Sequence, residues 1–298
     1  MIKRTLFFEN QVYLSLKDEQ LLITYPQKDL GPKTVPIEDI GIIVIETLFA
    51  TLTTALSNKL MEHGVGLVIC DARHMPSGLM LPLEGHTEQT KRIRTQLDAG
   101  LALKKNLWQQ TISVKITNQA KLLESRGFEA INLHRLAKEV QSGDQKNHEA
   151  RAAVYYWSTI FPLDKFTRDP EGDAPNDLLN YGYSILRSIT ARAIVSSGLL
   201  PSLGIFHKNK YNAFCLADDI MEPYRPFVDA LVLELIDSGN SVDFLSKQGK
   251  IHLLGIMGMD VIMDKQKSPL MVAMSRTTSS LYDCFSGKTR KILYPLYV

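Results

Sequence analysis

The sequence predicts an α+β protein in which a small β-rich N-terminal domain precedes a larger all-α-helical domain. Short apolar runs separated by polar turns fill about the first 78 residues, as is typical of strands. After a stretch rich in proline and glycine, apolar residues recur at helical spacing almost throughout the rest of the chain. We therefore expect a β-rich domain over 1–78, a linker over 79–86 and a helical domain over 87–298.

Length and composition favour a globular protein with two hydrophobic cores. The chain has 298 residues, of which 45% are hydrophobic and 22% charged. Apolar runs such as 42–45 fall far short of the ~18 residues that span a bilayer, and Glu9 comes too early for a secretory signal. We expect a cytoplasmic protein without a membrane partner. The three cysteines show no CxxC spacing, which argues against a disulfide framework or a structural zinc site and favours buried thiols.

Charge is distributed unevenly, although the net charge is only +2. Residues 91–126 hold 8 Lys/Arg against 2 Asp/Glu, and residues 247–298 hold 8 against 3. Between them, residues 127–246 hold 11 basic residues against 16 acidic ones. Basic surfaces around a carboxylate cluster suit an enzyme that acts on a polyanion such as DNA. Each basic block taken by itself also fits an ordinary solvated helix face.

The first 78 residues predict strands and one helix but contain no concentrated chemistry. The expected strands are 4–9, 11–16, 20–25, 41–45 and 65–71, and the expected helix is 51–63, with Gly64 after its end. We interpret this domain as structural or dimer-forming. Breaker residues then predict a turn at 75–78 and the linker at 79–86.

The remaining residues predict a series of helices. Ser268 is expected to be the N-cap of the last of them and Pro269 its first residue. Pro223 and Pro226 are expected to interrupt the helical pattern around them. The expected helical segments are 87–125, 129–141, 147–161, 176–197, 218–238 and 268–286.

The densest chemistry lies in residues 204–229. His207 precedes three carboxylates, Asp218, Asp219 and Glu222. Asp219 and Glu222 would share one face of a helix, where neighbouring carboxylates repel unless a cation lies between them. Imidazole and carboxylates together are ligands of divalent metals. The alternative is a helix N-terminus whose dipole favours acidic residues.

A further ligand should come from another helix, and Glu149 is the best candidate. It begins a helix whose opposite face is apolar, and small residues follow it, so that the helix can pack closely. His148 and Glu149 point about 100° apart and cannot easily share a site. The sequence shows no persuasive Ser–His–Asp arrangement and no GxxxxGK[ST] phosphate loop.

Two motifs together resemble a known family. NHEARAAVYYW at 147–157 and GIFHKNKYNAFCLADDIMEPYRP at 204–226 resemble the CRISPR spacer integrase, the first of the CRISPR-associated proteins. The order of domains and the length are similar as well. The helix LWQQTISVKITNQAKLL at 107–123 is similar to the type II branch in particular.

The resemblance implies one divalent metal, Mg²⁺ or Mn²⁺, bound by Glu149, His207 and Glu222. These three are the expected catalytic residues, and Asp219 is a secondary acidic neighbour. The family usually has glycine after the glutamate, where Ala150 stands here and keeps the position small.

The implied reaction inserts a short DNA fragment into the CRISPR repeat array. A 3′-hydroxyl attacks a phosphodiester of the repeat, and no covalent protein intermediate is needed. The implied partners are double-stranded DNA, a second copy of the chain in a homodimer, the small second CRISPR-associated protein and, in type II systems, the effector nuclease and a further adaptation protein.

Basic residues are candidates for contacts with the DNA backbone, which position a duplex without reading its sequence. Arg225 either contacts a phosphate or forms a structural ion pair with Glu222 or Asp229. Two other functions stay open, a hydrolase of small phosphate esters and a DNA-binding scaffold without chemistry. The remaining candidate DNA contacts are Lys91, Arg92, Arg94, Lys104, Lys105, Lys115, Lys288, Arg290 and Lys291.

Overall fold

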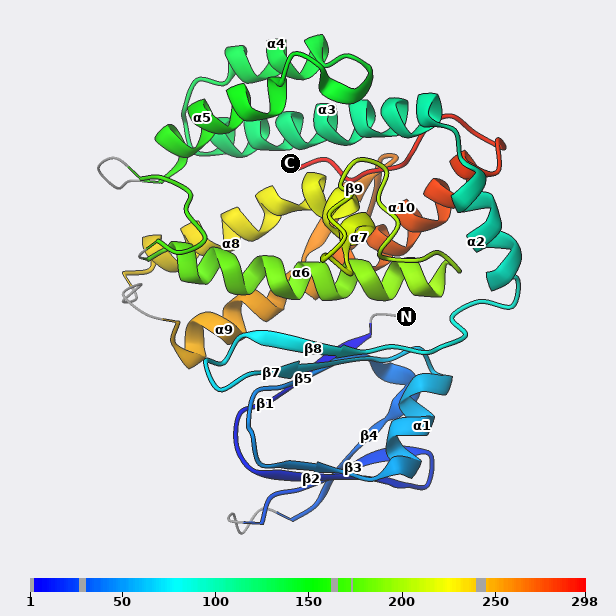
Figure 1. The fold of residues 1–298 in the computed structure, drawn as a ribbon. Helices are drawn as coiled ribbons and strands as arrows, with labels where there is room; N and C mark the ends of the chain where they lie inside the picture. Colours follow the sequence, from blue (N-terminus) through cyan, green and yellow to red (C-terminus); the bar gives the residue numbers. More distant parts are fainter. Residues whose placement is uncertain (1–2, 27–30, 162–165, 173, 240–244) are drawn as a thin grey trace. The chain divides into compact units, whose positions relative to one another are not determined.

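The computed structural model describes residues 3–26, 31–161, 166–172, 174–239 and 245–298. The chain divides into two compact units, Met1–Thr87 and Glu88–Val298. Within the described ranges the first contains two β-sheets and one α-helix, and the second is mostly helical (Figure 1). The predicted α+β class, with a β-rich part followed by a helical part, is confirmed.

The first unit is built on two four-stranded sheets. One has the order β1-β5-β7-β8, in which only β8 runs antiparallel to its neighbour. The other has the order β4-β3-β2-β6, in which β2 and β6 are parallel. The strands are β1 (Arg4–Phe8), β2 (Val12–Lys17), β3 (Gln20–Thr24), β4 (Lys33–Pro36), β5 (Ile40–Ile45), β6 (Ala50–Leu52), β7 (Gly66–Cys70) and β8 (Pro76–Met80).

A continuous apolar run forms the core of this unit. All six residues of β5 are buried, as the uninterrupted hydrophobicity of IGIIVI predicts. Helix α1 (Thr54–Glu62) buries Leu56 and Leu60. It begins three residues later than predicted because Ala50–Leu52 pair with β2 as β6, after which the Thr53 hydroxyl caps the helix at 3.3 Å from the Leu56 N–H.

The predicted turn at 75–78 is wrong beyond Met75. Pro76–Met80 form β8, which pairs with β7 and overlaps the first two residues of the predicted linker. Proline and glycine are compatible with this strand because it lies at the edge of its sheet, where one row of hydrogen bonds is not required.

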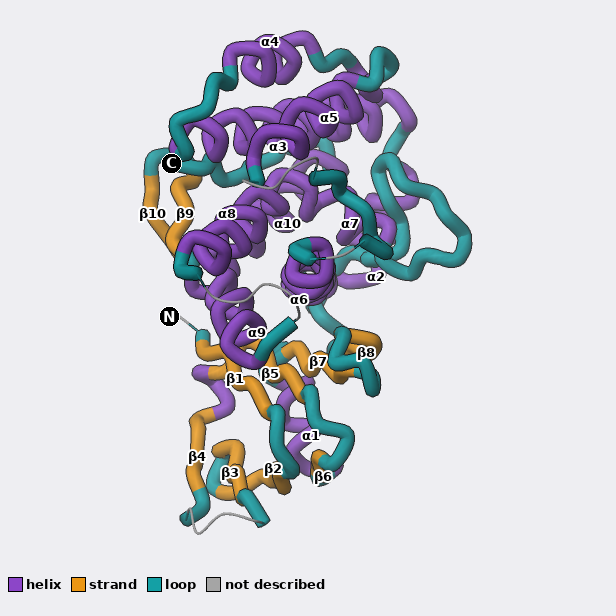
Figure 2. Tube along the Cα trace, turned by 90° about the vertical axis from the view of Figure 1, so that its left-hand side faces the viewer, coloured by secondary structure: helices purple, strands orange, loops and turns teal. Residues whose placement is uncertain are grey.

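The second unit is a set of helices in which the long helix α3 packs against α4, α5, α7 and α8. In both views α4 and α5 lie beside α3 (Figures 1 and 2). None of the helices in the described ranges combines the length and hydropathy of a membrane-spanning segment. The α-helices are α2 (Gln89–Asp98), α3 (Leu101–Ser125), α4 (Ile131–Glu139), α5 (His148–Ile160), α6 (Asn176–Ser196), α7 (Cys215–Met221), α8 (Arg225–Asp237), α9 (Lys247–Leu254) and α10 (Leu270–Phe285). The described residues also form the 3₁₀ turns η1 (Ile37–Asp39), η2 (Ser142–Asp144), η3 (Glu222–Tyr224) and η4 (Gly255–Gly258).

The prediction that this part is all-helical is wrong at one place. β9 (Asp260–Met263) and β10 (Gln266–Pro269) form an antiparallel hairpin, visible at the edge of Figure 2. Ser268 and Pro269, predicted to start the last helix, belong to β10, and Pro269 takes the N-cap position of α10. The three cysteines are free and buried, as predicted.

Candidate active site

Glu149 is held at the start of α5 by a buried carboxylate. Asp144 accepts hydrogen bonds from the backbone N–H groups of His148 and Glu149, each at 2.9 Å. It also contacts Nδ1 of the buried His148 at 3.1 Å. Asp144 therefore satisfies N–H groups that a helix start leaves without partners. The Glu149 side chain, 27% exposed, is left to reach across to α3.

His207 is oriented by Asp219 of α7. The Asp219 carboxylate is fully buried and accepts the backbone N–H groups of Phe206 at 2.9 Å and His207 at 3.2 Å. His207 Nδ1 lies 2.5 Å from the same carboxylate. Because Asp219 engages Nδ1, the Nε2 atom remains the nitrogen that can bind a metal. In this structure Asp219 therefore orients the His207 side chain through a hydrogen bond.

Aromatic packing fixes the ring further. Phe206 stacks on the buried Trp108 of α3 with centroids 4.1 Å apart. His207 meets Trp108 edge-on at 5.7 Å and Phe206 at 5.4 Å. Two faces of the loop are therefore anchored, one on α3 and one on α7.

Gly204 makes the approach of this loop to α7 possible. A Cβ atom at position 204 would lie 2.4 Å from the His207 carbonyl oxygen and 2.8 Å from Asp219 Oδ2. Both distances are too short for real contacts, so a residue with a side chain would push His207 and Asp219 apart.

Glu222 stands where α7 gives way to the turn η3. Pro223 cannot donate a backbone hydrogen bond, and the chain restarts as α8 after one short turn. Glu222 is 5% exposed, and its Oε1 accepts from Arg225 Nε at 2.9 Å. Burial by itself would raise the pKa of Glu222, but Arg225 and Lys115 hold that pKa below its ordinary value.

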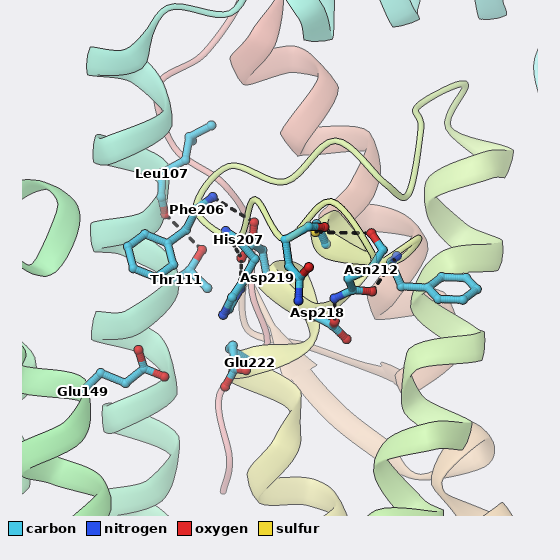
Figure 3. Close-up of polar contacts among 12 residues, drawn as sticks. Leu107, Thr111, Glu149, Phe206, His207, Asn212, Asp218, Asp219 and Glu222 are labelled. Carbon is cyan, nitrogen blue, oxygen red and sulfur yellow. Dashed lines mark hydrogen bonds and ion pairs between the residues drawn. The ribbon is translucent and has the colours of Figure 1, made fainter. Parts of the chain in front are cut away.

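Glu149 and Glu222 meet at one ammonium group. Lys115 Nζ lies 2.6 Å from Glu149 Oε1 and 2.6 Å from Glu222 Oε2. In Figure 3 the Glu149 carboxylate points from α5 toward Glu222, and the His207 side chain lies just above Glu222 in the view. The hydrogen bond to Asp219 and the nearby charge of Glu222 both raise the pKa of His207, against a lowering by burial. The three predicted ligands therefore lie in one region, although Glu149 belongs to α5, His207 to the 204–214 loop and Glu222 to η3.

The donor set fits a divalent cation, although the described residues contain no preassembled group of three metal-ligating side chains. The two carboxylates already hold a cation between them. Glu222 Oε2 is buried and, within the described ranges, accepts no hydrogen bond of good geometry. Two carboxylates and one imidazole are ligands that suit Mn²⁺ and Mg²⁺.

The candidate DNA contacts differ in their exposure. Arg92 donates to the Ser197 carbonyl oxygen at 3.0 Å and lies over the Tyr282 ring at 4.0 Å, which leaves its side chain 16% exposed. Lys115 is 12% exposed and occupied by the two glutamates. Arg225 pairs with Glu222, as one of the two alternatives predicted. Lys105, Lys288 and Arg290 are exposed, and Lys104 is half-buried.

A cavity of about 330 Å³ adjoins the histidine. His207 is part of its lining, together with basic and amide side chains and with apolar residues such as Leu97 and Leu203. An anion that entered this space would therefore meet several hydrogen-bond donors close to His207. Its polar lining includes Gln96, Lys104, Lys208, Asn209, Lys210 and Asn212.

Asp229 is a buried carboxylate that the sequence indicated only as a possible ion-pair partner of Arg225. Asp229 of α8 accepts hydrogen bonds from Tyr156 Oη at 2.7 Å and Tyr183 Oη at 2.5 Å. Arg225 lies over the Tyr183 ring at 4.6 Å, so this network supports the residue that braces Glu222. Burial raises the pKa of Asp229 to about 6, although both tyrosines and Arg225 act in the opposite direction.

The raised pKa of Asp229 predicts a pH-dependent stability. Between pH 3.8, the ordinary pKa, and about 6, the folded protein binds the Asp229 proton more tightly than the unfolded chain does. The unfolding free energy therefore rises as the pH falls through 6. Relative to Asp229→Asn, wild type should gain about 1.3 kcal/mol from pH 7 to pH 5. Urea unfolding followed by tryptophan fluorescence measures this, because Trp108 and Trp157 both lie in the second unit. A difference that stays constant with pH would contradict the assignment.

Comparison with known proteins supports one family. The family described as CRISPR associated protein Cas1 matches residues 6–258. The CRISPR-associated endonuclease Cas1 of Neisseria meningitidis serogroup C is 38% identical over 295 residues, which cover 98% of this chain and 95% of that protein. A Cas1 endonuclease of Saccharolobus solfataricus is 29% identical over 247 residues, which cover 80% of this chain and 76% of that protein.

Solved structures share the fold. A casposase bound to integration product has a TM-score of 0.78 at 23% identity, covering 98% of this chain and 92% of that one. A CAS1 protein from Thermotoga maritima has a TM-score of 0.74 at 19% identity, covering 95% and 97%. With the family match over most of its length and a 38% identical relative over almost all of it, this chain belongs to the Cas1 family of CRISPR-associated endonucleases.

Proposed function

We propose that this Cas1 protein joins short DNA fragments to the CRISPR repeat by transesterification, at a divalent metal held by Glu149, His207 and Glu222. The observation that carries the proposal is the meeting of two carboxylates around one cation, beside a histidine whose Nδ1 is engaged by Asp219. When bound there, Mg²⁺ or Mn²⁺ would polarise a phosphodiester and stabilise the charge on a leaving alkoxide.

The protein's own residues would orient the metal-binding side chains and hold the DNA. Asp219, Phe206 and Trp108 keep the imidazole in one orientation, and Arg225 keeps Glu222 in place. The basic and amide groups of the cavity beside His207 suit the phosphates of a DNA end. An incoming 3′-hydroxyl attacks the scissile phosphate, and the 3′ end of the cleaved strand leaves. The exchange of one phosphodiester for another requires no covalent bond to the protein.

The proposed partners follow from the family. Related chains are found in structures described as a Cas6-RT-Cas1–Cas2 complex and as a Cas1–DNA complex, with TM-scores of 0.74 and 0.51. By analogy we propose that this chain binds double-stranded DNA and the small second CRISPR-associated protein, forms a homodimer through its N-terminal domain, and works in the cytoplasm where the repeat array lies. The similarity of residues 107–123 suggests the type II branch, whose effector nuclease and further adaptation protein would then take part.

A strand-joining assay tests this function. The reaction contains the purified protein, the second CRISPR-associated protein, a supercoiled plasmid with the repeat and a labelled duplex with free 3′-hydroxyls. We expect labelled plasmid with Mn²⁺ or Mg²⁺, none with a chelator and none with a duplex that ends in 3′-deoxy residues. Hydrolysis of small phosphate esters without joining would favour a hydrolase, and DNA binding without metal-dependent chemistry would favour a scaffold.

A further inference from the structure

Lys115 lies between Glu149 and Glu222 and is too buried to be an ordinary surface contact to DNA. Lys115 is largely buried, and its Nζ lies 2.6 Å from one oxygen of Glu149 and 2.6 Å from one oxygen of Glu222. It comes from the middle of α3, whereas the carboxylates come from α5 and η3. A single cation therefore joins three elements that are distant in the sequence.

The face of α3 that carries Lys115 is fixed on both sides. One turn earlier, Thr111 contacts the Tyr294 hydroxyl at 2.9 Å. One turn later, Asn118 donates to the carbonyl oxygen of Pro223 at 2.7 Å, next to Glu222. Residues 111, 115 and 118 lie on one side of the helix, so the contacts of Thr111 and Asn118 fix the Lys115 side chain between Glu149 and Glu222.

Charge balance explains why a cation is needed there. Arg225 neutralises one side of Glu222, whereas the cation that faces Glu149 in the described structure is Lys115. Without Lys115, two carboxylates would face each other in a partly buried site, and their repulsion would drive them apart or make them take up a proton. Lys115 Nζ lies 2.6 Å from both carboxylates, so its ammonium group balances charge that Arg225 leaves on the Glu149 side.

We propose that Lys115 is a tethered counter-ion that holds Glu149 and Glu222 when no metal is bound, and that a divalent cation has to displace it in order to bind. The inference rests on the proposed metal site. It adds that metal affinity is set by a competition between two cations for the same oxygens, one part of the chain and the other from solution. Lys115 is then a positioning residue, because it keeps the carboxylates near each other before the metal arrives.

Binding of Mn²⁺ without DNA tests the competition. Titration calorimetry compares wild type with Lys115→Met and Lys115→Gln, in which the charge is removed, and with Lys115→Arg, in which it is kept. We expect the neutral variants to bind Mn²⁺ at least about tenfold more tightly than wild type, since no ion pair has to be broken first. The arginine variant should bind no more tightly than wild type.

Thermal unfolding gives a second readout. In metal-free buffer the neutral variants should melt at a lower temperature than wild type, and Mn²⁺ should raise their melting temperature more than that of wild type. If the methionine variant does not fold without metal, the glutamine variant carries the test, because its amide can still donate to a carboxylate. Lys59→Met is the matched control, since Lys59 also contacts two glutamates, Glu19 and Glu62, in the other unit. It should leave Mn²⁺ affinity unchanged.

The possible failures differ from one another. If Glu149→Gln abolishes Mn²⁺ binding but both folded neutral variants bind as weakly as wild type or more weakly, the competition is refuted and the metal site stands. If wild type and the neutral variants bind no Mn²⁺, the metal site and the competition are both refuted. Tighter binding in the neutral variants alone supports the inference.

Discussion

We expect the Glu149→Gln variant to join DNA strands at least about a thousandfold more slowly than wild type, because the charge that helps to hold the metal is lost and metal catalysis supplies several kcal/mol. The Glu149 side chain is 27% exposed and lies in the first turn of α5, whose N–H groups are held by Asp144. The variant should therefore fold normally. Glu222 is a poorer choice for this test, since its buried carboxylate braces Arg225 as well.

The control for this prediction is Glu139→Gln. Glu139 ends the neighbouring helix α4, and its side chain is 51% exposed. Both variants should keep the circular dichroism and melting temperature of wild type, while only Glu149→Gln loses strand joining and Mn²⁺ binding. Joining at wild-type rate in Glu149→Gln would refute the assignment of this residue as a ligand.

The Asp219→Asn variant is expected to lose about ten- to a hundredfold in Mn²⁺ affinity and a similar factor in strand joining, as is usual when the partner of a ligating histidine is removed. Asp219 accepts three hydrogen bonds, from two backbone N–H groups and from His207 Nδ1. An asparagine amide has one acceptor oxygen, so its NH₂ group has to face at least one of these donors. If it faces Nδ1, the proton moves to Nε2, which is the nitrogen that the metal needs.

Asp218→Asn provides the comparison for Asp219. Asp218 is the adjacent carboxylate of α7, but it pairs with Arg187 at 2.7 Å and with Asn212 at 2.7 Å. It should keep the tautomer of His207 and wild-type Mn²⁺ affinity. Equal losses in both variants would mean that Asp219 supports α7 in general and has no particular role toward the histidine.

Periodicity was enough to predict the fold class, and the errors fall on elements with weak local signals. β4 and β6 have four and three residues with mixed exposure, which is too short for an alternating pattern. The β9–β10 hairpin turns at Asp264 and Lys265, with φ of 50° and 62°. Asparagine and glycine usually mark such a turn, so the Asp-Lys pair gave no signal.

Residue types and motifs pointed to Glu149, His207 and Glu222, but not to what surrounds them. Lys115 looked like a phosphate contact because it lies in a basic helix. Lys115 and Glu222 are 107 positions apart, so no local pattern in the sequence could predict their ion pair. From the sequence, Asp219 was expected to be a secondary acidic neighbour of the metal. Only the contact of its carboxylate with His207 Nδ1 shows that it orients the imidazole ring. Packing of α3 against α5 and η3 decides the role of Lys115, and the contact of the His207 loop with α7 decides that of Asp219. The sequence pattern carries no direct trace of either.

The glycine at 204 gives this arrangement a recognisable spacing. Gly204, His207, Asp219 and Glu222 are separated by three, twelve and three positions. Each interval has a structural cause. Position 204 lies too close to its neighbours for a side chain, the loop after His207 returns to the helix that carries Asp219, and one helical turn separates Asp219 from Glu222. A search of uncharacterised sequences with this spacing, rather than with the motif letters, should therefore find distant proteins in which a buried aspartate orients a histidine in the same way, even where the surrounding residues have diverged beyond alignment.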